Sequence, residues 1–574
     1  MADLYASEPR HKIARVSEVL QSQLLQPINI NPVQPQFAES NLNIYKGAGP
    51  ASPSYNEYNP LFNRNQVSLQ ASGVIGQKGI WGNEVAVNAI YDRLSVSLGQ
   101  FYYASDGFRT NNDQTKEIYN VFAQGMLSYQ TSLQFEARYT DHQYGDLPLL
   151  YDPNWYYGDQ RQTDRIRYFR GGLHHSFAPG HDVILNVSYN NDDYRAHIHI
   201  PPVIDPGNLT FDLLSDVDDD PKGYLAETQY LFRSNLFRAI VGGGYADIRS
   251  TFSDNTQLTG LIDGFPIFVD QSQSSMDYDI HHWNVYAYTH TTYPWNVIWT
   301  LGVSADWWND TLSDLRRDQV NPKLGVIWNP TASTTLRAAA FRVMKREMVS
   351  YQTVEPTQVA GFNQFFDEPA GTDYWRYGVG LDQKILSNLF SGVELSKRDL
   401  TVPWSVSTGT GAYDYHEASW EEQLARVYLY WALNPMVALT TEYRYERFKR
   451  NPDFPGVESF HTVDTHRVPL GVNFYHPSGL IAQFRATYVY QDGDFIDRDK
   501  TWTTPPFDNQ YTSWSDNFWV CDALLGYRLP KRFGLISVEA KNIFNQGFHF
   551  QDTDPANPSI TPDRLIVGRI TLNF

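Results

Sequence analysis

The region from Gln66 to Phe574 alternates apolar and polar residues with a period of two. Leu133 and Phe135, for example, alternate with Gln134 and Glu136, and the same spacing recurs in many further segments. Successive side chains of a β-strand point to opposite faces, so this spacing predicts strands with one apolar and one polar face. Such strands suit a wall that meets lipid on one side and a polar lumen on the other.

The connections between the predicted strands alternate between short and long. Short turns are expected at 128–131, 179–181, 294–296 and 477–479, and long polar, aromatic-rich stretches at 144–164, 200–222, 250–276, 346–373 and 495–516. This alternation is typical of outer-membrane barrels with short periplasmic turns and long extracellular loops. At roughly 23 residues per strand and connection, residues 65–574 predict an all-β fold: a transmembrane antiparallel up-and-down β-barrel of about 22 strands.

Residues 1–64 differ from the rest and form a predicted N-terminal extension. Apolar residues recur there at steps of three and four, namely Ile13, Val16, Leu20 and Leu24. Because Pro27 interrupts this pattern, we expect an amphipathic helix over 10–26, followed by a Pro- and Asn-rich segment. Two interpretations stay open: a linker or the end of an upstream domain, or a strap that lies inside or under the barrel.

Composition narrows the class of protein. The chain has 45 Lys and Arg against 64 Asp and Glu, a net charge of −19, so it carries no basic stripe for nucleic acid and we expect no nucleic-acid partner. No run of about 20 apolar residues exists, which excludes a membrane protein built from helices. The mean hydropathy of −0.45 suits a barrel, in which every second residue faces water. The single cysteine, Cys521, excludes an intramolecular disulfide framework.

The last strand carries a pattern that points to a cellular location. Ile566, Ile570, Leu572 and Phe574 share one face, and the chain ends on that phenylalanine. This end resembles the recognition signal that the barrel assembly machinery of Gram-negative bacteria uses during insertion. We therefore predict the bacterial outer membrane as the location, with outer-membrane lipid, lipopolysaccharide and that machinery as partners.

Residues 537–545, Ser-Val-Glu-Ala-Lys-Asn-Ile-Phe-Asn, resemble the penultimate-strand motif of TonB-dependent receptors. The resemblance implies a barrel of 22 strands that imports siderophores, vitamin B12 or glycans and is filled by an N-terminal plug. The 64 residues before the first strand are too few for such a plug, and we find no TonB box. The chain also resembles the barrel at the end of longer outer-membrane proteins with a periplasmic helical-repeat module, so a periplasmic partner or upstream module is expected.

Charged residues on the predicted inner face are candidates for lining the lumen. They are Glu136, Arg138, Glu442, Arg444, Arg485, Arg528, Glu539 and Arg569. Mixed charges on neighbouring strands can hold the wall together by cross-strand pairing, and they can also shape the field across a channel. Pairing is the simpler role for these side chains.

Aromatic and acidic residues in the predicted loops are candidates for contacts. Trp155, Tyr156, Phe362, Phe365 and Phe366 could stack on a sugar or anchor a protein, or could belong to the interfacial girdle. Asp216, Asp218 and Asp220 are weak candidates for calcium, because the EF-hand spacing is missing and solvated charge explains them as well. His197 and His199 share a strand face but have no third ligand at metal spacing.

No catalytic motif occurs, so we expect neither an enzyme nor a cofactor. The first hypothesis is a polar-lined conduit that translocates a hydrophilic substrate across the outer membrane. The second is a receptor of the TonB-dependent type for an iron chelate or glycan, with its plug absent from this chain. The third is a membrane anchor for a surface assembly or adhesion through the extracellular loops.

Overall fold

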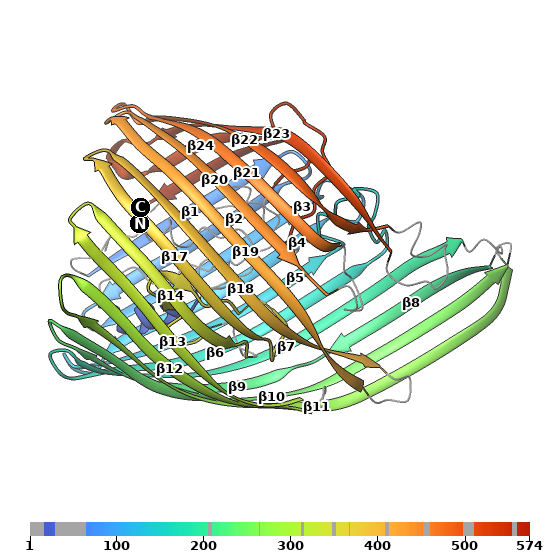
Figure 1. The fold of residues 1–574 in the computed structure, drawn as a ribbon, viewed down its shortest axis with the longest axis horizontal. Coiled ribbons are helices and arrows are strands. Elements are labelled where there is room, and N and C mark those ends of the chain that lie inside the picture. Colours follow the sequence, from blue (N-terminus) through green and yellow to red (C-terminus); the bar gives the residue numbers. More distant parts are fainter. Residues whose placement is uncertain are drawn as a thin grey trace.

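A computed structural model describes residues 16–28, 65–204, 209–262, 265–311, 315–346, 352–366, 368–407, 413–451, 460–497, 510–553 and 560–574. Within these ranges, the main sheet has 23 antiparallel strands, and all of them except β8 form the wall of the barrel. The wall closes because β1 pairs with β25, from Gln70 opposite Asn573 to Gly76 opposite Val567 (Figure 1). The prediction of a 22-stranded antiparallel barrel is therefore confirmed.

The strands of the first half of the wall are β1 (Gln66–Gly76), β2 (Trp81–Tyr91), β3 (Leu94–Ser105), β4 (Gln114–Met126), β5 (Thr131–Tyr144), β6 (Arg161–Ala178), β7 (His181–Ile204), β9 (Lys222–Arg233), β10 (Phe237–Ile262), β11 (Phe265–Thr292) and β12 (Val297–Asp310). Those of the second half are β13 (Leu315–Thr331), β14 (Thr334–Met344), β17 (Asp373–Leu386), β18 (Leu389–Ser407), β19 (Tyr413–Asn434), β20 (Val437–Lys449), β21 (Phe460–Tyr475), β22 (Leu480–Ile496), β23 (Tyr511–Arg528), β24 (Gly534–Lys541) and β25 (Leu565–Asn573). A 3-10 turn, η2 (Pro530–Arg532), joins β23 to β24.

The two faces of the wall differ as the alternation predicts. On β5, Phe135 is 49% exposed on the outer face, whereas Glu136 beside it is 1% exposed on the inner face. Large apolar side chains such as Val285 and Leu525 are exposed on the outside, where lipid replaces water. None of the helices in the described chain is long and apolar enough to cross a bilayer.

Two of the stretches expected to be loops are strands. Residues 200–222 contain the end of β7 and an additional strand, β8 (Leu209–Asp219), and residues 250–276 contain the ends of β10 and β11. Strand β8 pairs with β7 on one side and β10 on the other, beyond the point where β9 begins (Figure 1). These parts are rich in Asp, Ser, Thr and Gln, which is typical of loops, although Leu209, Phe211 and Leu213 of β8 alternate with polar residues as strand residues do.

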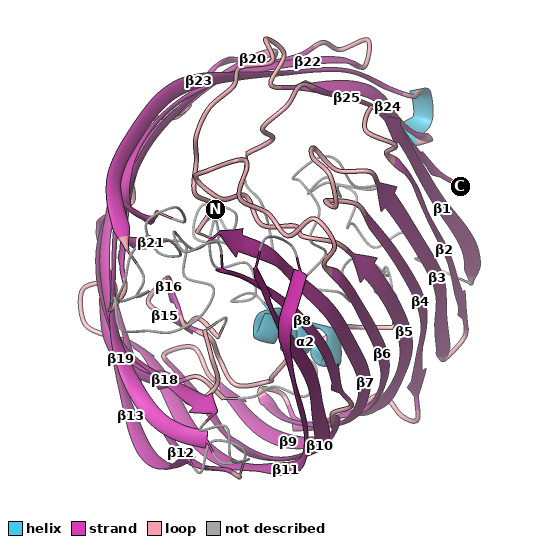
Figure 2. Cartoon of the chain, turned by 90° about the vertical axis from the view of Figure 1, so that its right-hand side faces the viewer, coloured by secondary structure: helices cyan, strands magenta, loops and turns pink. Residues whose placement is uncertain are grey.

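Among the described residues, a helix and several inward-folded connections lie in the lumen (Figure 2). The helix, α2 (Val16–Leu25), lies within the predicted helix 10–26, whose first residues, 10–15, are outside the described part. The connection between β14 and β17 carries a short hairpin, β15 (Gln358–Val359) and β16 (Phe362–Asn363). The domain boundary near residue 64 falls outside the described residues and stays a prediction.

Candidate functional site

Helix α2 packs against the inner wall of the barrel. Leu20 and Leu24, each 1% exposed, lie in one apolar cluster with Ile184 of β7 and Leu231 of β9. Residues four apart lie on the same face of a helix, so the predicted apolar stripe of α2 is the surface that meets the wall.

Amide side chains of the wall hold the C-terminal end of α2. Gln134 of β5 donates from Nε2 to the carbonyl of Gln23 at 2.6 Å, and Gln124 of β4 donates to the carbonyl of Gln26 at 2.9 Å. The last carbonyls of a helix have no partner within the helix, and these glutamines supply one from outside. Pro27 then follows, where the helical pattern ends.

The described residues of the connection between β14 and β17, 345–346, 352–366 and 368–372, also fold into the lumen and reach β9, and we call them the connection 345–372. The Thr353 hydroxyl and the Val354 amide both donate to the carboxylate of Glu227, the latter at 3.2 Å. Gln229 donates from Nε2 to the carbonyl of Val354 at 2.6 Å. Side chains of β9 therefore bind the backbone of this connection at Val354.

A second buried carboxylate, Glu355, anchors the same connection to β11. It accepts hydrogen bonds from the Tyr288 hydroxyl at 2.8 Å and from Asn284 at 3.2 Å. Arg346 forms an ion pair with it at 3.1 Å. A carboxylate buried without such donors would cost several kcal/mol. The donors on the wall and Arg346 therefore stabilise the buried charge of Glu355.

Helix α2 and the connection 345–372 meet at Val354. This side chain is 1% exposed and belongs to the apolar cluster that contains Leu20 and Leu24. The two segments come from distant parts of the chain, and both pack on the wall in the same apolar cluster. We call this contact the Val354 latch.

The hairpin of β15 and β16 turns at Ala360 and Gly361, whose φ angles are 48° and 87°. Two successive positive φ angles are typical of a type I′ turn, for which glycine is favoured. A Cβ atom on Gly361 would lie 2.7 Å from Nη1 of Arg337, so this position has no room for a side chain. The tight turn lets the hairpin approach the wall closely.

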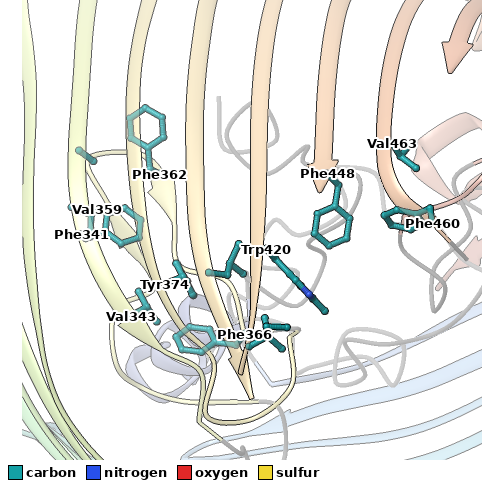
Figure 3. Close-up of a cluster of buried hydrophobic side chains, with 14 of the residues drawn as sticks. Phe341, Val343, Val359, Phe362, Phe366, Tyr374, Trp420, Phe448, Phe460 and Val463 are labelled. Atoms are coloured by element: carbon teal, nitrogen blue, oxygen red, sulfur yellow. The ribbon is translucent and has the colours of Figure 1, made fainter. Parts of the chain in front are cut away.

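Aromatic rings of the connection lie between arginines of the wall. The ring of Phe362 is 5.1 Å from the guanidinium of Arg337 and 5.8 Å from that of Arg376. Phe365 is 4.5 Å from Arg376 and 4.8 Å from Arg398. Phe362 also belongs to a larger apolar core. The other residues of this core come mostly from β14 and from the strands β17 to β22 (Figure 3). Each arginine over a ring adds a cation–π attraction to the burial of the ring.

Carboxylates balance these buried arginines. Arg337 pairs with Asp382 at 3.0 Å and Glu394 at 2.8 Å. Arg398 pairs with Glu422 at 2.7 Å and with Glu368. Because Glu368 comes from the connection and Glu422 from β19, Arg398 ties the connection to the wall.

A second set of connections, around Tyr151 and Gln551, packs against β22 and β23. The ring of Tyr151 stacks on Phe495 at 4.0 Å and lies 5.7 Å from Trp514. Gln491 exchanges two hydrogen bonds with the backbone of Gln551, at 2.7 and 3.0 Å. Burial, with Asp516 nearby, raises the pKa of Tyr151 to about 12, so its hydroxyl stays neutral.

Comparison with known proteins supports the same fold. A family model described as TonB dependent receptor-like, beta-barrel matches residues 143–378. The pyoverdine receptor FpvA from Pseudomonas aeruginosa PAO1, solved bound to pyoverdine, is 12% identical with a TM-score of 0.64, over 89% of this chain and 79% of that one. BauA, the ferric preacinetobactin receptor from Acinetobacter baumannii, is 10% identical with a TM-score of 0.61, over 89% and 80%.

The ferric citrate transporter FecA is 14% identical with a TM-score of 0.59, over 92% of this chain and 82% of that one. Likeness at such low identity shows the fold, and the family model adds a match in sequence. No curated protein sequence matches the chain. The chain is therefore similar to the TonB-dependent receptor-like β-barrels, in sequence over residues 143–378 and in fold over most of its length. The similarity to this family inferred from residues 537–545 is confirmed, although the family model matches another part of the barrel and the motif itself stays a resemblance.

This TonB-dependent receptor-like barrel is a transport-type protein of the bacterial outer membrane. The predicted insertion signal lies on β25, the strand that closes the wall against β1. Ile566, Ile570 and Phe574 are exposed on its outer face, and Leu572 shares their parity. Recognition of this strand by the barrel assembly machinery stays a prediction.

The predicted lumen-lining residues lie on the inner face of the receptor-like barrel, most of them in ion pairs. Glu136 pairs with Arg170 at 3.0 Å and with Arg138 at 3.7 Å. Glu442 pairs with Arg426 at 2.8 Å and Arg444 at 2.6 Å, and Glu539 pairs with Lys541 at 2.7 Å. Arg485 and Arg528 are exposed, and Arg569 is half-buried. Sequence reasoning missed Arg170, Arg426 and Lys541, although each occupies an alternate position of a predicted strand.

The predicted loop-contact residues divide into two groups. Phe362, Phe365 and Phe366 are at most 4% exposed, so they pack the interior and are not accessible to an external partner. Trp155 and Tyr156 are half-buried, and Tyr156 lies 5.0 Å from the guanidinium of Arg109. The wall arginines explain the difference, because buried phenylalanine rings offer them a favourable partner.

The candidate calcium ligands lie next to histidine, arginine and lysine side chains. Asp216 and His197 are 2.6 Å apart, Asp218 and Arg195 3.4 Å, and Asp220 and Lys222 2.7 Å. His199, the other candidate, lies between Asp159 and Asp212 at 3.0 and 2.7 Å. Across the described ranges, no three His, Cys, Asp or Glu side chains converge in a way that could hold a metal ion.

Proposed function

We propose that the barrel is a gated conduit for a hydrophilic substrate, with α2 and the connection 345–372 as the gate. The Val354 latch carries this proposal, because it joins helix α2 to a second segment that folds into the lumen. The inner wall supports it as well, since its residues are mostly polar or charged and suit the passage of a hydrated molecule. We infer no enzymatic role, in keeping with the receptors and transporters of the family.

Planar-bilayer conductance tests the gate. The intact chain should show low conductance, and removal of residues 1–28, which include α2, should raise it to a large and steady level. The double variant Leu20→Ala and Leu24→Ala should act in the same direction with a smaller effect, because it weakens the Val354 latch but keeps the helix. Leu185→Ala is the matched control, since Leu185 is 38% exposed on the outer face of β7 and does not touch the helix.

Two results would overturn the gate. A large steady conductance of the intact chain would mean that the lumen is already open. Unchanged low conductance after removal of residues 1–28 would mean that α2 does not control the pathway.

We infer a second candidate function, uptake of a ferric chelate, because the similar structures include receptors for pyoverdine and preacinetobactin and a ferric citrate transporter. This function requires energy from the inner membrane through a periplasmic partner. Cells that import a radiolabelled ferric chelate through this barrel should therefore lose uptake when the proton-motive force is dissipated. Uptake that persists without the proton-motive force would favour the passive conduit.

A further inference from the structure

Aromatic rings on the outer face of β6, β7 and β9 mark the surface of the membrane. Phe169 of β6 is 45% exposed, and Tyr189 of β7 packs against Tyr224 of β9 with ring centroids 4.8 Å apart. Such rings lie where the acyl chains of the lipid meet the headgroups. Because the short turns face the periplasm, the rings at the other end of these strands mark the outer leaflet.

The next outward-facing residues on the same strands form a row. They are Arg167, Asn191 and Lys222, each two residues beyond the ring of its own strand on the extracellular side. Arg167 lies opposite Asn191, and Asn191 lies opposite Lys222. The flanking strands carry carboxylates at the same step beyond their own tyrosines, Asp141 on β5 and Asp247 on β10. We call Arg167, Asn191 and Lys222 the basic row.

Arg167 differs from the other outward-facing arginines of β6 to β10. The others pair with carboxylates at 2.8 to 3.2 Å, and they are Arg161, Arg165, Arg195 and Arg249. Arg167 is exposed, and it has no ion pair with any residue that the structure describes. Lys222 contacts Asp220 at 2.7 Å. The basic row therefore carries a positive charge, at headgroup level, that no carboxylate balances.

An apolar hollow lies on the outer face of the wall, within the bilayer. It has a volume of about 520 Å³, and its lining includes one row of residues that lie opposite one another on β4 to β7, namely Ala123, Phe135, Gly171 and Val187. A Cβ atom on Gly171 would meet no atom within 4 Å, so this glycine helps to open the hollow. Glycine weakens the interior of a strand and often marks a place where a ligand approaches closely.

The basic row, the rings and the hollow follow one another along β6. Arg167, Phe169 and Gly171 occupy successive outward positions, and four residues of strand place the hollow about 13 Å from Arg167. A membrane lipid has the same order of phosphate, interface and acyl chain. The four strands of the hollow span about 14 Å, which is wider than one acyl chain.

The lipid of the outer leaflet is the molecule that surrounds this surface in the bacterial outer membrane. Both lipopolysaccharide and a glycerophospholipid offer a phosphate above acyl chains. Lipopolysaccharide carries more chains on one headgroup, so it fills a hollow of this width better.

We propose that one lipopolysaccharide molecule binds here, with a phosphate of its lipid A on Arg167 and Lys222 and its acyl chains in the hollow. The guanidinium of Arg167 donates two parallel hydrogen bonds to phosphate oxygens, and Lys222 adds a second positive charge. The amide of Asn191 lies between them and donates to the same group. Apolar contact in the hollow then distinguishes this lipid from a free phosphate.

Native mass spectrometry of the full chain tests the headgroup contacts. The chain is prepared in detergent micelles free of lipopolysaccharide, and purified diphosphoryl lipid A is the probe. The wild type should retain one lipid A per barrel. The double variant Arg167→Gln and Lys222→Gln should weaken binding at least tenfold. Both side chains lie at the surface, so the barrel should stay folded, which circular dichroism checks.

A second row of the same kind supplies the matched control. Lys397, Gln423 and Arg447 lie opposite one another on β18, β19 and β20. Carboxylates accompany both cations, since Lys397 pairs with Asp399 and Glu421 at 2.9 and 3.0 Å, and Arg447 lies 3.9 Å from Asp464. The double variant Lys397→Gln and Arg447→Gln removes the same charge and should change lipid A binding less than twofold.

A leucine in the hollow tests the acyl-chain contacts. Gly171→Leu should weaken lipid A binding at least fivefold, because the new side chain occupies the space of a chain. Gly568→Leu is the matched control on the outer face of β25, where a Cβ atom would lie 3.8 Å from its nearest neighbour, and it should leave binding unchanged.

Three results would overturn the proposal. Equal weakening by the two double variants would mean that lipid A responds only to the overall charge. Unchanged binding to Gly171→Leu would mean that no acyl chain lies in the hollow. Phosphatidylglycerol that binds as tightly as lipid A would make a glycerophospholipid the occupant.

Discussion

Two long stretches of the chain, 345–372 and 250–276, look alike in the sequence pattern but lie in different parts of the structure. Both interrupt the lipid-facing alternation, and both are expected to be extracellular loops. The first folds back into the lumen and buries Phe362 and Phe365 among arginines of the wall. The second continues outward as paired strands, with water on both sides. We call these strands the outer sheet: residues 194–204 of β7, all of β8, residues 249–262 of β10 and residues 265–279 of β11.

The difference shows that, for segments outside the bilayer, side-chain chemistry determines whether the segment folds into the lumen or extends into water. Burial of one phenylalanine is worth about 2–3 kcal/mol, and the wall offers both apolar surface and arginines to receive it. Serine, threonine and glutamine gain little from burial, but their backbone can still pair, and each cross-strand pair adds only about 0.2–1 kcal/mol. The inward connection should therefore depend on a few residues, and the outer sheet on many.

The largest effect is expected for Arg398→Met. It removes the guanidinium between Glu368 and Glu422, which leaves two buried carboxylates without their cation. The free energy of unfolding should fall by about 3–5 kcal/mol, measured by urea unfolding in lipid vesicles. Lys397→Met is the matched control: Lys397 is the exposed neighbour with ion pairs to Asp399 and Glu421, and its loss should cost less than about 1 kcal/mol. Equal losses would contradict the division between inward and outward segments.

A smaller effect is expected for Phe362→Leu. This change keeps most of the apolar volume but removes the aromatic face that meets Arg337 and Arg376. The loss should be about 1–2 kcal/mol in the same assay, since each cation–π contact is worth about 0.5–1 kcal/mol. Phe169→Leu, at a lipid-exposed position of β6, serves as control and should change stability much less. If the two variants behave alike, apolar burial and not the arginines holds the connection inside.

In the outer sheet, a pH dependence is expected at His199. Hydrogen bonds from His199 to Asp159 and Asp212, partly offset by burial, raise its pKa above the usual 6.5. A raised histidine pKa stabilises the fold fully below pH 6.5, and the contribution disappears as the pH rises through the folded-state value. The effect should be below about 1 kcal/mol, because the Asp159 side chain is 71% exposed. Urea unfolding at pH 5.5 and 8.5 should show that the wild type exceeds His199→Gln in stability only at the lower pH.

The smallest effect is expected for Ser275→Ala, which removes one rung of the outer sheet. Ser275 and Ser253 share an exposed hydrogen bond of 3.2 Å across β10 and β11. The change should alter the free energy of unfolding by less than about 0.5 kcal/mol, since water replaces the partner. A loss of several kcal/mol would show that the outer sheet, like the inward connection, depends on single residues.

The alternation by itself determined the barrel, its strand number, its lipid-facing side and its location in the outer membrane. Such properties follow from a period of two, because lipid and lumen impose opposite demands on successive residues. The inner position of Glu136 and Glu442 follows from the same rule. The spacing of Leu20 and Leu24 likewise predicts an apolar face of a helix, but it does not predict which residues pack on that face.

Only the tertiary structure determines where the segments without this alternation lie. Nothing local in residues 352–366 indicates that Thr353 and Val354 bind Glu227, more than a hundred residues away, or that Phe365 lies between two arginines of other strands. The sequence also does not show that β11 continues its pairing with β10 beyond the end of β12. These features depend on which strands close around the lumen and how far each extends. Periodicity reports the local environment of a residue, and it carries no information about partners brought together by closure of the barrel.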